Sequence, residues 1–333
     1  MTLLDVQDLT VTLKSSRTVL EVVQGVSFRV ERGETLAIVG ESGSGKSMTV
    51  HAVLRLLPEA VSIRSGSVLF EGTDLGSLDA RGLARLRGAR IGLVSQEPMT
   101  ALNPVFTVGA QIVEALRLHR ELSRAEAWQR AIELLGLVRI RAAAERAHQY
   151  PHELSGGMRQ RVAIAMALAC EPALLIADEP TTALDASTQA SVLALIGELK
   201  ERFRMGVLLV SHDLNVVAEV ADRVAVMYAG RLVEHGPTEQ VLARPAHPYT
   251  KGLVDVSRLG DYTPGSRLPE IPGSAPPLAE RPIGCPFAPR CAFAAETCRT
   301  ERPTLVALDG AREVACFRPL RVEPSNERRE AYA

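Results

Sequence analysis

The segment that most constrains the fold is GESGSGKS, residues 40–47, which fits the pattern G-x-x-x-x-G-K-S. The apolar run ETLAIVG before it predicts a buried strand, and KSMTVHAVLRLL after it predicts a helix that Pro58 ends. Glycines in such a turn let successive backbone N–H groups face an anion without side-chain clashes. The segment therefore predicts a phosphate-binding loop between a strand and a helix, with a nucleoside triphosphate as its ligand.

Two side chains of this loop carry most of its chemistry. Lys46 brings a positive charge to the phosphates, and the hydroxyl of Ser47 is a ligand for Mg²⁺. A glycine-rich connector that only happens to contain Lys-Ser is the plain alternative, and the flanking strand and helix disfavour it. The residues predicted to contact nucleotide and Mg²⁺ in this segment are Gly40, Glu41, Ser42, Gly43, Ser44, Gly45, Lys46, Ser47 and Met48.

A second apolar run, ALLIADEP, ends in the carboxylates Asp178 and Glu179. A carboxylate at the tip of a strand beside a phosphate loop reaches the magnesium shell, and a neighbouring carboxylate polarises the attacking water. Taken alone, Asp-Glu after an apolar run is often a strand that gives way to a solvated loop. Beside a phosphate loop, the pair instead predicts that the nucleotide is hydrolysed.

The apolar periodicity of the chain predicts an α/β fold. LLDVQDLTVTL and VVQGVSFRV alternate apolar with polar residues, which is typical of an antiparallel sheet at the start. RIGLVSQ and MGVLLVSH join ETLAIVG and ALLIADEP as buried strands, each followed by polar or helical sequence. This rhythm predicts a parallel core sheet packed by helices.

Two other regions interrupt this rhythm. Residues 107–150 read as helices without strands, and SRAEAWQRAIELLGL begins with a capping box of Ser123 and Glu126 and ends at Gly136. After RVAVMYAGRLVEHG, a hairpin that turns at residues 229–230, the composition becomes rich in proline and poor in periodicity. A domain boundary is therefore expected near residue 237, with a tail domain after it.

Charge and hydropathy argue against nucleic acid and anionic lipid as partners and against a membrane span. The formal net charge of −1 gives no basic footprint for nucleic acid or for anionic lipid. The start, MTLLDVQDLTVTLKSS, lacks the features of a secretory signal, and no apolar run reaches the roughly 18–20 residues that cross a bilayer. A chain in the reducing cytosol is not expected to form structural disulfides, so the four cysteines clustered among the last 49 residues point to metal or catalysis.

An ordered set of further motifs identifies a family. LSGGMRQR, residues 154–161, lies between the two phosphate-site segments, with Gln96 in VSQEP, Asp185 in TTALDA and His212 in VSHDL. Together they resemble the nucleotide-binding subunits of ABC transporters over residues 1–237. The resemblance implies a P-loop NTPase ABC cassette with a parallel core sheet, an N-terminal antiparallel β-subdomain and a helical subdomain at about residues 97–160.

The resemblance also implies roles for the matching residues. Asp178 supports the metal, Glu179 is the general base or positions the attacking water, and His212 contacts the γ-phosphate. Gln96 joins magnesium and the attacking water to the helical region, and Asp185 communicates across a dimer. As lone residues, His212 would be a satisfied core histidine and Gln96 a polar loop residue.

Ser155, Gly156 and Gly157 open a helix, so their N–H groups and the positive helix end form a second anion site. By resemblance this site faces the γ-phosphate held by a partner subunit. Family members often stack adenine on an early aromatic, but no Phe, Tyr or Trp precedes Phe28, and Arg17 or a neighbouring aliphatic is the substitute.

QEPMTALNP, AHPYTKGLV and GCPFAPRC resemble one branch, the ATPases of bacterial oligopeptide and dipeptide importers. In that branch residues 238–333 correspond to a C-terminal extension, and its cysteines are similar to ligands of a [4Fe–4S] cluster. Four thiolates satisfy tetrahedral Zn²⁺ equally well in number, although gaps of five, six and seventeen residues do not match the short pairs typical of zinc sites. The candidate ligands are Cys285, Cys291, Cys298 and Cys316; Cys170 is expected to be buried packing.

The resemblance implies a peripheral ATPase at the cytoplasmic face of the cell membrane that powers uptake of di- or oligopeptides. Its implied partners are two transmembrane permease subunits, a second homologous ATPase (a heterodimer, with a homodimer as the alternative) and an extracytoplasmic substrate-binding protein, without nucleic acid. Two other functions stay open: a soluble ABC protein that acts on DNA or ribosomes, and a metal-dependent interaction module that is gated by ATP. The cargo, peptide or nickel, is not encoded in this subunit.

Overall fold

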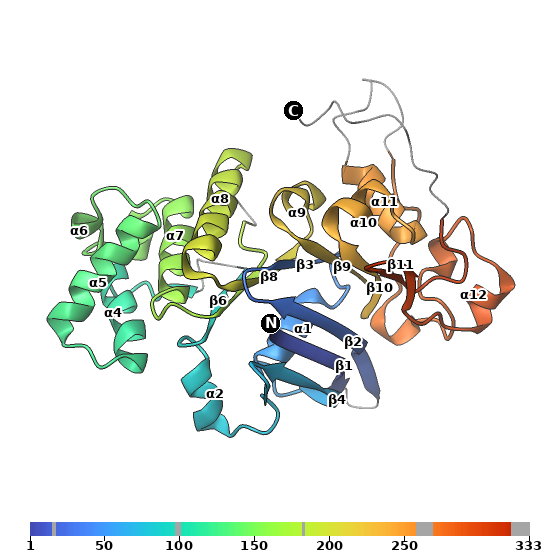
Figure 1. Cartoon of the computed structure of the whole chain (residues 1–333), viewed down its shortest axis with the longest axis horizontal. Coiled ribbons are helices and arrows are strands. Elements are labelled where there is room, and N and C mark those ends of the chain that lie inside the picture. Colours follow the sequence, from blue (N-terminus) through green and yellow to red (C-terminus); the bar gives the residue numbers. More distant parts are fainter. Residues whose placement is uncertain (15–17, 97–100, 182–183, 258–268, 321–333) are drawn as a thin grey trace.

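The computed structural model describes residues 1–14, 18–96, 101–181, 184–257 and 269–320. In these ranges the chain forms an eight-stranded sheet and a four-stranded sheet, with helices around both (Figure 1). A helical arm extends from one end of the larger sheet, and the C-terminal extension lies at the opposite end. The molecule is an α/β protein, as the sequence predicts.

The centre of the larger sheet is parallel and buried on both faces. Its strands are β3 (Thr35–Val39), β6 (Ile91–Val94), β7 (Leu174–Asp178), β8 (Gly206–Ser211) and β9 (Arg223–Tyr228). They lie in the order β9-β3-β8-β7-β6, and each pair of neighbours is parallel. Burial on both faces explains why these segments are continuous apolar runs, and the four buried strands expected from the sequence are confirmed.

The smaller sheet is antiparallel and begins the chain. Its strands are β1 (Thr2–Lys14), β2 (Val19–Glu31), β4 (Val61–Phe70) and β5 (Thr73–Asp74), in the order β2-β1-β4-β5. Along β1 and β2 buried residues tend to alternate with exposed ones, because one face packs on the core and the other meets solvent. The antiparallel start expected from the alternating pattern is confirmed.

Helix α1 (Lys46–Val53) contacts strands of both sheets. The sequence predicted that this helix would continue to Pro58, and that expectation was wrong by several residues. Arg55 has a φ of 55°, which breaks the helical path. The guanidinium of Arg87 donates hydrogen bonds to the carbonyls of Leu54 and Arg55, at 2.8 and 2.9 Å, and so satisfies two acceptors that the early end leaves free.

The helical arm contains the strand-free region expected from the sequence. The elements are α2 (Ala80–Leu86) before it, then α4 (Val108–His119), α5 (Arg124–Leu137), α6 (Ala143–Arg146), the short 3₁₀ helix η1 (Pro151–Glu153) and α7 (Gly156–Ala167). The capping box is present: Glu126 N–H donates to Ser123 Oγ at 3.3 Å, and Ser123 N–H donates to the Glu126 carboxylate at 2.8 Å. Helix α5 ends one residue beyond Gly136.

The expected hairpin joins β9 to β10 (Arg231–Pro237). Ala229 and Gly230 have φ values of 47° and 83°, the left-handed pair that a tight two-residue hairpin requires. The extension then follows with α10 (Thr238–Ala243), α11 (Pro248–Ser257), η3 (Leu278–Glu280), η4 (Ala288–Arg290), α12 (Glu296–Thr300), β11 (Val306–Asp309) and β12 (Arg312–Val314).

The extension continues the larger sheet. Strand β12 pairs antiparallel with β10, so the full order becomes β11-β12-β10-β9-β3-β8-β7-β6. Beside this junction the buried carboxylate of Glu234 accepts hydrogen bonds from the N–H groups of Ala246 and His247, both at 2.8 Å. The domain boundary near residue 237 stays a prediction, and backbone pairing crosses it.

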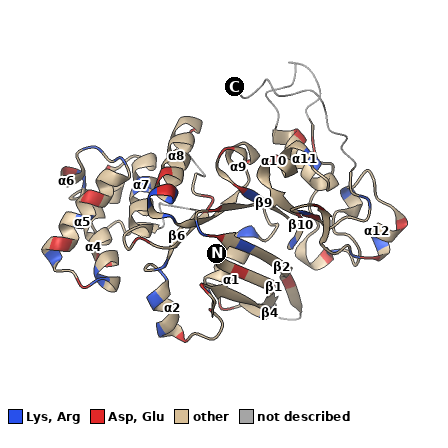
Figure 2. Ribbon diagram, viewed as in Figure 1, with Lys and Arg blue, Asp and Glu red and all other residues tan. Residues whose placement is uncertain are grey.

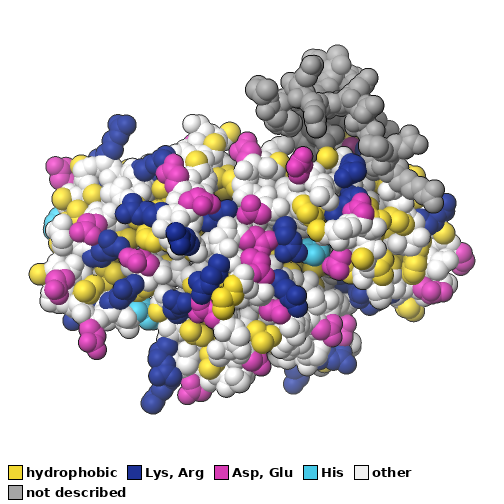
Figure 3. All heavy atoms as spheres, viewed as in Figure 1, with side chains coloured by type: hydrophobic (Ala, Val, Ile, Leu, Met, Phe, Trp, Pro, Cys, Tyr) yellow, Lys and Arg dark blue, Asp and Glu magenta, His cyan; other side chains and the backbone are white. Residues whose placement is uncertain are grey.

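Charged side chains of both signs are distributed over the described elements (Figure 2). On the face shown in Figure 3, blue and magenta side chains alternate over short distances. Among the described helices, none has both the length and the apolar character that crossing a bilayer requires.

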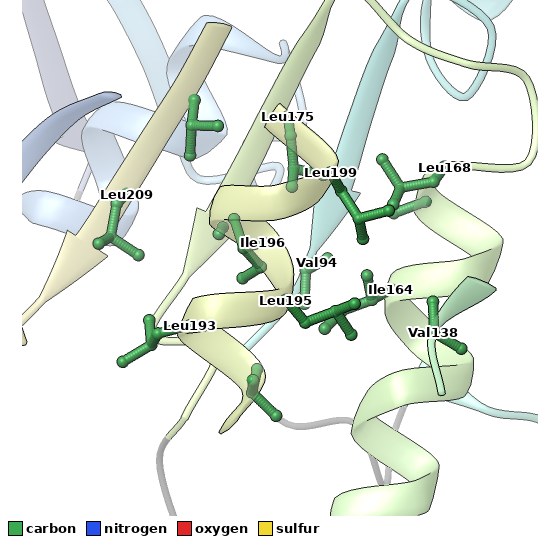
Figure 4. Packing of buried hydrophobic residues seen from close by; sticks show 14 of the residues in the cluster. Val94, Val138, Ile164, Leu168, Leu175, Leu193, Leu195, Ile196, Leu199 and Leu209 are labelled. Atoms are coloured by element: carbon green, nitrogen blue, oxygen red, sulfur yellow. The ribbon is translucent and has the colours of Figure 1, made fainter. Parts of the chain in front are cut away.

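The core between the sheet and the helical arm is formed by α8 (Ala186–Phe203), with α9 (Leu214–Val220) further along the same face. Leu195 and Leu199 of α8 lie beside Ile164 of α7 and Leu168, the residue that follows α7 (Figure 4). All four side chains are almost wholly buried. This packing joins the C-terminal halves of the two helices, whose first turns follow two of the predicted nucleotide segments.

Candidate active site

The phosphate loop lies between β3 and α1, as predicted. Gly40, Gly43 and Gly45 have φ values of 151°, 77° and 104°, which are conformations that residues with a Cβ rarely adopt. A Cβ on Gly40 would also lie 2.2 Å from the carbonyl oxygen of Met227. The glycines are therefore required by backbone geometry and by the close approach of β9.

Lys46 is the first residue of α1, and its side chain folds back over the loop. Its ammonium donates to the carbonyl oxygens of Gly40 and Glu41, at 2.8 and 3.1 Å. The residue is 5% exposed, and burial lowers the pKa of Lys46, an effect that the carboxylates of Glu179 and Asp178 oppose. The Lys46 ammonium is thus a buried cation beside the loop. When nucleotide binds, phosphate oxygens would replace the carbonyl oxygens of Gly40 and Glu41 as its hydrogen-bond acceptors.

Ser47 and Asp178 meet across the site. The Ser47 hydroxyl donates to the Asp178 carboxylate at 3.1 Å, and Asp178 ends the wholly buried strand β7. Burial raises the pKa of Asp178, and the bond from Ser47 opposes that shift. A hydroxyl and a carboxylate oxygen are hard ligands of the kind that Mg²⁺ prefers, so this pair fits a magnesium ion beside the phosphates.

Gln96 and His212 both lie within hydrogen-bonding distance of one carboxylate oxygen of Glu179. Glu179 Oε2 accepts a hydrogen bond from Gln96 Nε2 at 3.2 Å and lies 3.2 Å from His212 Nδ1. The three residues follow β6, β7 and β8, which are adjacent parallel strands, so their carboxyl ends share one edge. The backbone of Glu179 has a φ of 46°, and its N–H is held by the carbonyl of Val210 at 3.0 Å.

The segment predicted to form a second anion site lies elsewhere on the same chain. Ser155 caps α7 by accepting a hydrogen bond from Met158 N–H at 3.4 Å, and Ser155 and Gly156 are exposed. Within the described ranges, no hydrogen bond or ion pair joins residues 155–157 to the phosphate loop.

Asp185 caps α8 next to this segment. Its carboxylate accepts hydrogen bonds from the N–H and the hydroxyl of Thr188, at 2.9 and 2.7 Å, and these bonds lower the pKa of Asp185. A Cβ on Gly157 would lie 2.8 Å from Thr188 Cγ2, so the starts of α7 and α8 are in close contact. Arg17, the suggested partner of adenine, lies outside the described residues.

Comparison with known proteins decides the family. Residues 23–182 match the family described as ABC transporter, and residues 233–298 match the oligopeptide/dipeptide transporter C-terminal region. A probable peptide ABC transporter ATP-binding protein of Sinorhizobium fredii is 50% identical over 319 residues, which is 95% of each chain. A Brucella melitensis protein named as a peptide import ATP-binding protein is 50% identical over 95% of this chain and 97% of its own length.

The chain belongs to the ABC transporter family. Solved structures agree with this placement. A dimeric structure of the bacterial ABC transporter cassette MJ0796 has a TM-score of 0.64 and 30% identity, and covers 71% of this chain and 98% of its own. The cassette cbiO1 of Clostridium perfringens has a TM-score of 0.63 and 28% identity, and covers 73% and 91%. The fold is that of an ABC cassette, as expected, and the chain is an ABC-type ATPase.

Sequence reasoning missed two residues of the cassette's extension that reach the phosphate loop. Glu41 N–H donates to the hydroxyl of Tyr249 at 2.8 Å, and the Glu41 carboxylate accepts from Arg290 at 2.8 and 3.0 Å. Tyr249 occurs in AHPYTKGLV and Arg290 in GCPFAPRC, two segments whose resemblance to oligopeptide and dipeptide importer ATPases gives no sign of a contact with the loop. No periodicity or spacing could have paired them with Glu41, since Arg290 is 249 residues away.

The four clustered cysteines of the extension line one small pocket, called the thiol pocket below: Cys285, Cys291, Cys298 and Cys316. The backbone N–H groups of Ala295 and Arg318 donate to two of the sulfurs, at 3.5 and 3.4 Å. Burial raises the pKa of Cys316 to about 11, while the bond from Arg318 opposes that rise.

The thiol pocket is narrow. Its volume is about 20 Å³, the space of about one water molecule, so an iron–sulfur cube requires the sulfurs to move apart. Within the described ranges, no group of three or more His, Cys, Asp or Glu side chains is arranged to hold a metal ion. The iron–sulfur and zinc expectations have no support from this arrangement. Cys170 is buried, as expected.

Proposed function

We propose that the chain is the ATP-hydrolysing subunit of a membrane importer for di- or oligopeptides, peripheral to the cytoplasmic face of the membrane. The single observation that carries this proposal is the match of both parts of the chain: an ABC cassette followed by the C-terminal region of oligopeptide and dipeptide transporters. Relatives 50% identical over nearly their whole length are named for peptide import.

The mechanism proposed for this subunit uses its two separated half-sites. Lys46 and the glycine amides hold the triphosphate, and Ser47 and Asp178 hold Mg²⁺. Glu179 takes a proton from the attacking water, while Gln96 and His212 hold the reacting oxygens in place. Residues 155–157 contact the γ-phosphate bound by a second ATPase subunit, so ATP closes the dimer and hydrolysis reopens it.

The proposed partners are two transmembrane permease subunits, an extracytoplasmic substrate-binding protein and a second homologous ATPase, in a heterodimer or a homodimer. The interspersed charges in Figures 2 and 3 support a protein partner over nucleic acid, whose binding calls for a continuous basic surface. In this scheme closure of the ATPase pair moves the permease subunits.

The deciding experiment purifies the tagged full chain from membranes after mild solubilisation. Two membrane-spanning subunits and a second ATPase are expected to accompany it, identified by mass spectrometry. Recovery with ribosomes or DNA instead would contradict the importer function.

The same preparation tests the shared ATP site through Ser155→Phe. The bulky side chain blocks the start of α7, so phosphate release by the assembled complex is expected to fall at least about tenfold. ATP affinity of the isolated chain should stay within about twofold, because Ser155 serves the partner's nucleotide. Ser65→Phe, on exposed β4, is the control. A matching loss of affinity in the isolated chain would mean that residues 155–157 bind the chain's own nucleotide.

We also propose that the thiol pocket holds a metal centre, a [4Fe–4S] cluster with Zn²⁺ as the alternative. The gathering of four sulfurs around one pocket supports it, as do the N–H donors, because such bonds stabilise thiolates around a cluster. A bound centre would hold a proline-rich segment that has little apolar sequence of its own.

Anaerobically purified full chain is expected to contain iron and acid-labile sulfide, measured by elemental and colorimetric analysis. The variant Cys298→Ser should lose most of the iron, because a cube needs all four thiolates, whereas Cys170→Ser should keep it. Stoichiometric zinc without iron would replace the cluster by the alternative, and protein free of both metals would end the proposal.

A further inference from the structure

Two residues of the extension, Tyr249 and Arg290, form hydrogen bonds with Glu41 of the phosphate loop. The peptide that joins Gly40 to Glu41 is bound on both sides: its N–H donates to Tyr249 Oη at 2.8 Å, and its C=O accepts from Lys46 Nζ at 2.8 Å. In a trans peptide these two groups point in opposite directions. Tyr249 therefore holds one side of the Gly40–Glu41 peptide, and the opposite side of the same peptide holds the Lys46 ammonium that is predicted to bind phosphate.

The Glu41 side chain is held as firmly as its backbone. Both of its carboxylate oxygens accept from the guanidinium of Arg290, at 2.8 and 3.0 Å, in the two-pronged geometry that is the strongest form of this ion pair. Within the loop, Glu41 O also accepts from Lys46. The negative charge of Glu41 thus lies close to the phosphate site, and Arg290 neutralises it.

Arg290 and Tyr249 are themselves fixed in place. The Arg290 side chain is 6% exposed, and its Nε and Nη2 donate to the carbonyls of Pro272 and Ile271, at 2.8 and 3.2 Å. The fully buried ring of Tyr249 packs on Tyr228, with 4.6 Å between the centroids. Two immobile groups therefore hold Glu41, and little entropy is lost when they do so.

We propose that Tyr249 and Arg290 are positioning residues of the ATP site, which hold Glu41 so that Lys46 and the loop amides fit a triphosphate. Tyr249 acts through the Gly40–Glu41 peptide. Arg290 acts by cancelling a carboxylate that would otherwise repel the phosphates. Both residues act on Glu41 of the loop, so the rate of the hydrolysis step itself is expected to stay unchanged.

The test is titration of the purified full chain with Mg²⁺–ATP by calorimetry. Arg290→Gln is expected to weaken ATP binding about tenfold, because it leaves Glu41 charged and unpaired. Tyr249→Phe removes one oxygen and should weaken binding about threefold to fivefold. Arg290→Lys should recover part of the loss, since it keeps the charge without the fork. Arg302→Gln is the control, because this exposed arginine of the extension contacts Gln24 and Ile283 but not the loop.

A second comparison separates positioning from a purely structural role. The double variant Glu41→Gln/Arg290→Gln should bind ATP more tightly than Arg290→Gln alone, because the unpaired charge is gone. In the assembled complex, Tyr249→Phe should raise KM for ATP while kcat stays within about twofold. ATP binding as tight as wild type in folded Tyr249→Phe and Arg290→Gln would overturn the proposal. If Arg290→Gln fails to fold, unchanged binding by Tyr249→Phe overturns it alone.

Discussion

The variant Glu179→Gln is expected to keep ATP bound and to lose about 10²–10⁴-fold in turnover, the usual contribution of a general base. Glutamine preserves the size of the side chain and its contacts with Gln96 and His212, but it cannot accept the proton of the attacking water. Because the substitution keeps the shape of the side chain and leaves Lys46 and the loop amides in place, ATP binding should survive. The measurements are phosphate release by the assembled complex and ATP titration of the isolated chain.

The matched control for this experiment is Glu219→Gln, an exposed glutamate on α9. It should hydrolyse ATP at the wild-type rate. Turnover of Glu179→Gln within a few-fold of wild type would remove Glu179 from the role of base, and loss of ATP binding would show that it serves the nucleotide instead.

The variant Lys46→Ala should weaken ATP binding by about 10²-fold or more. An ion pair at about 4 Å is worth about 4 kcal/mol at the effective dielectric of a protein site, and truncation removes the one cation that the described loop residues aim at the phosphates. Lys46 is buried, so solvent ions screen it little. Calorimetric titration with Mg²⁺–ATP measures the change.

Lys251→Ala provides the comparison for Lys46→Ala, because Lys251 is half-exposed and pairs with Asp255 on α11. Its affinity for ATP should match wild type. A Lys46→Ala protein that is folded and still binds ATP as wild type does would show that the glycine amides suffice without the ammonium.

The sequence could indicate that Gln96, Glu179 and His212 lie near one another because each follows an apolar run; their catalytic roles stay predictions. Gln96, Glu179 and His212 each come directly, or one residue, after a buried strand, and parallel neighbours bring their ends together. Ser47 and Asp178 meet because the loop after β3 and the end of β7 lie at the same edge of the parallel sheet. These positions depend on a polar residue that follows an apolar run and on the rule that the carboxyl ends of parallel strands share one edge of the sheet. Beyond the strand order, no contact between distant segments was needed to predict them.

What could not be predicted depends on contacts between distant segments. The early end of α1 is stabilised by Arg87, which caps the carbonyls of Leu54 and Arg55 from the end of another helix and leaves no mark in the sequence around Leu54. Strand β12 has only three residues, too few to show an alternating pattern. Because this strand is not recognisable in the sequence, the extension is predicted as a separate tail, and its hydrogen bonds to Glu41 cannot be predicted.

The pairing of β12 with β10 means that the last third of the chain is no detachable accessory. Cutting after Pro237 would bare the rim of the main sheet, and the Glu234 carboxylate would keep its buried position without the amides that now solvate it. A chimera that carries the extension of a related transporter would have to re-form the backbone hydrogen bonds between β10 and β12. Chimeras joined at this point should therefore aggregate and be degraded quickly.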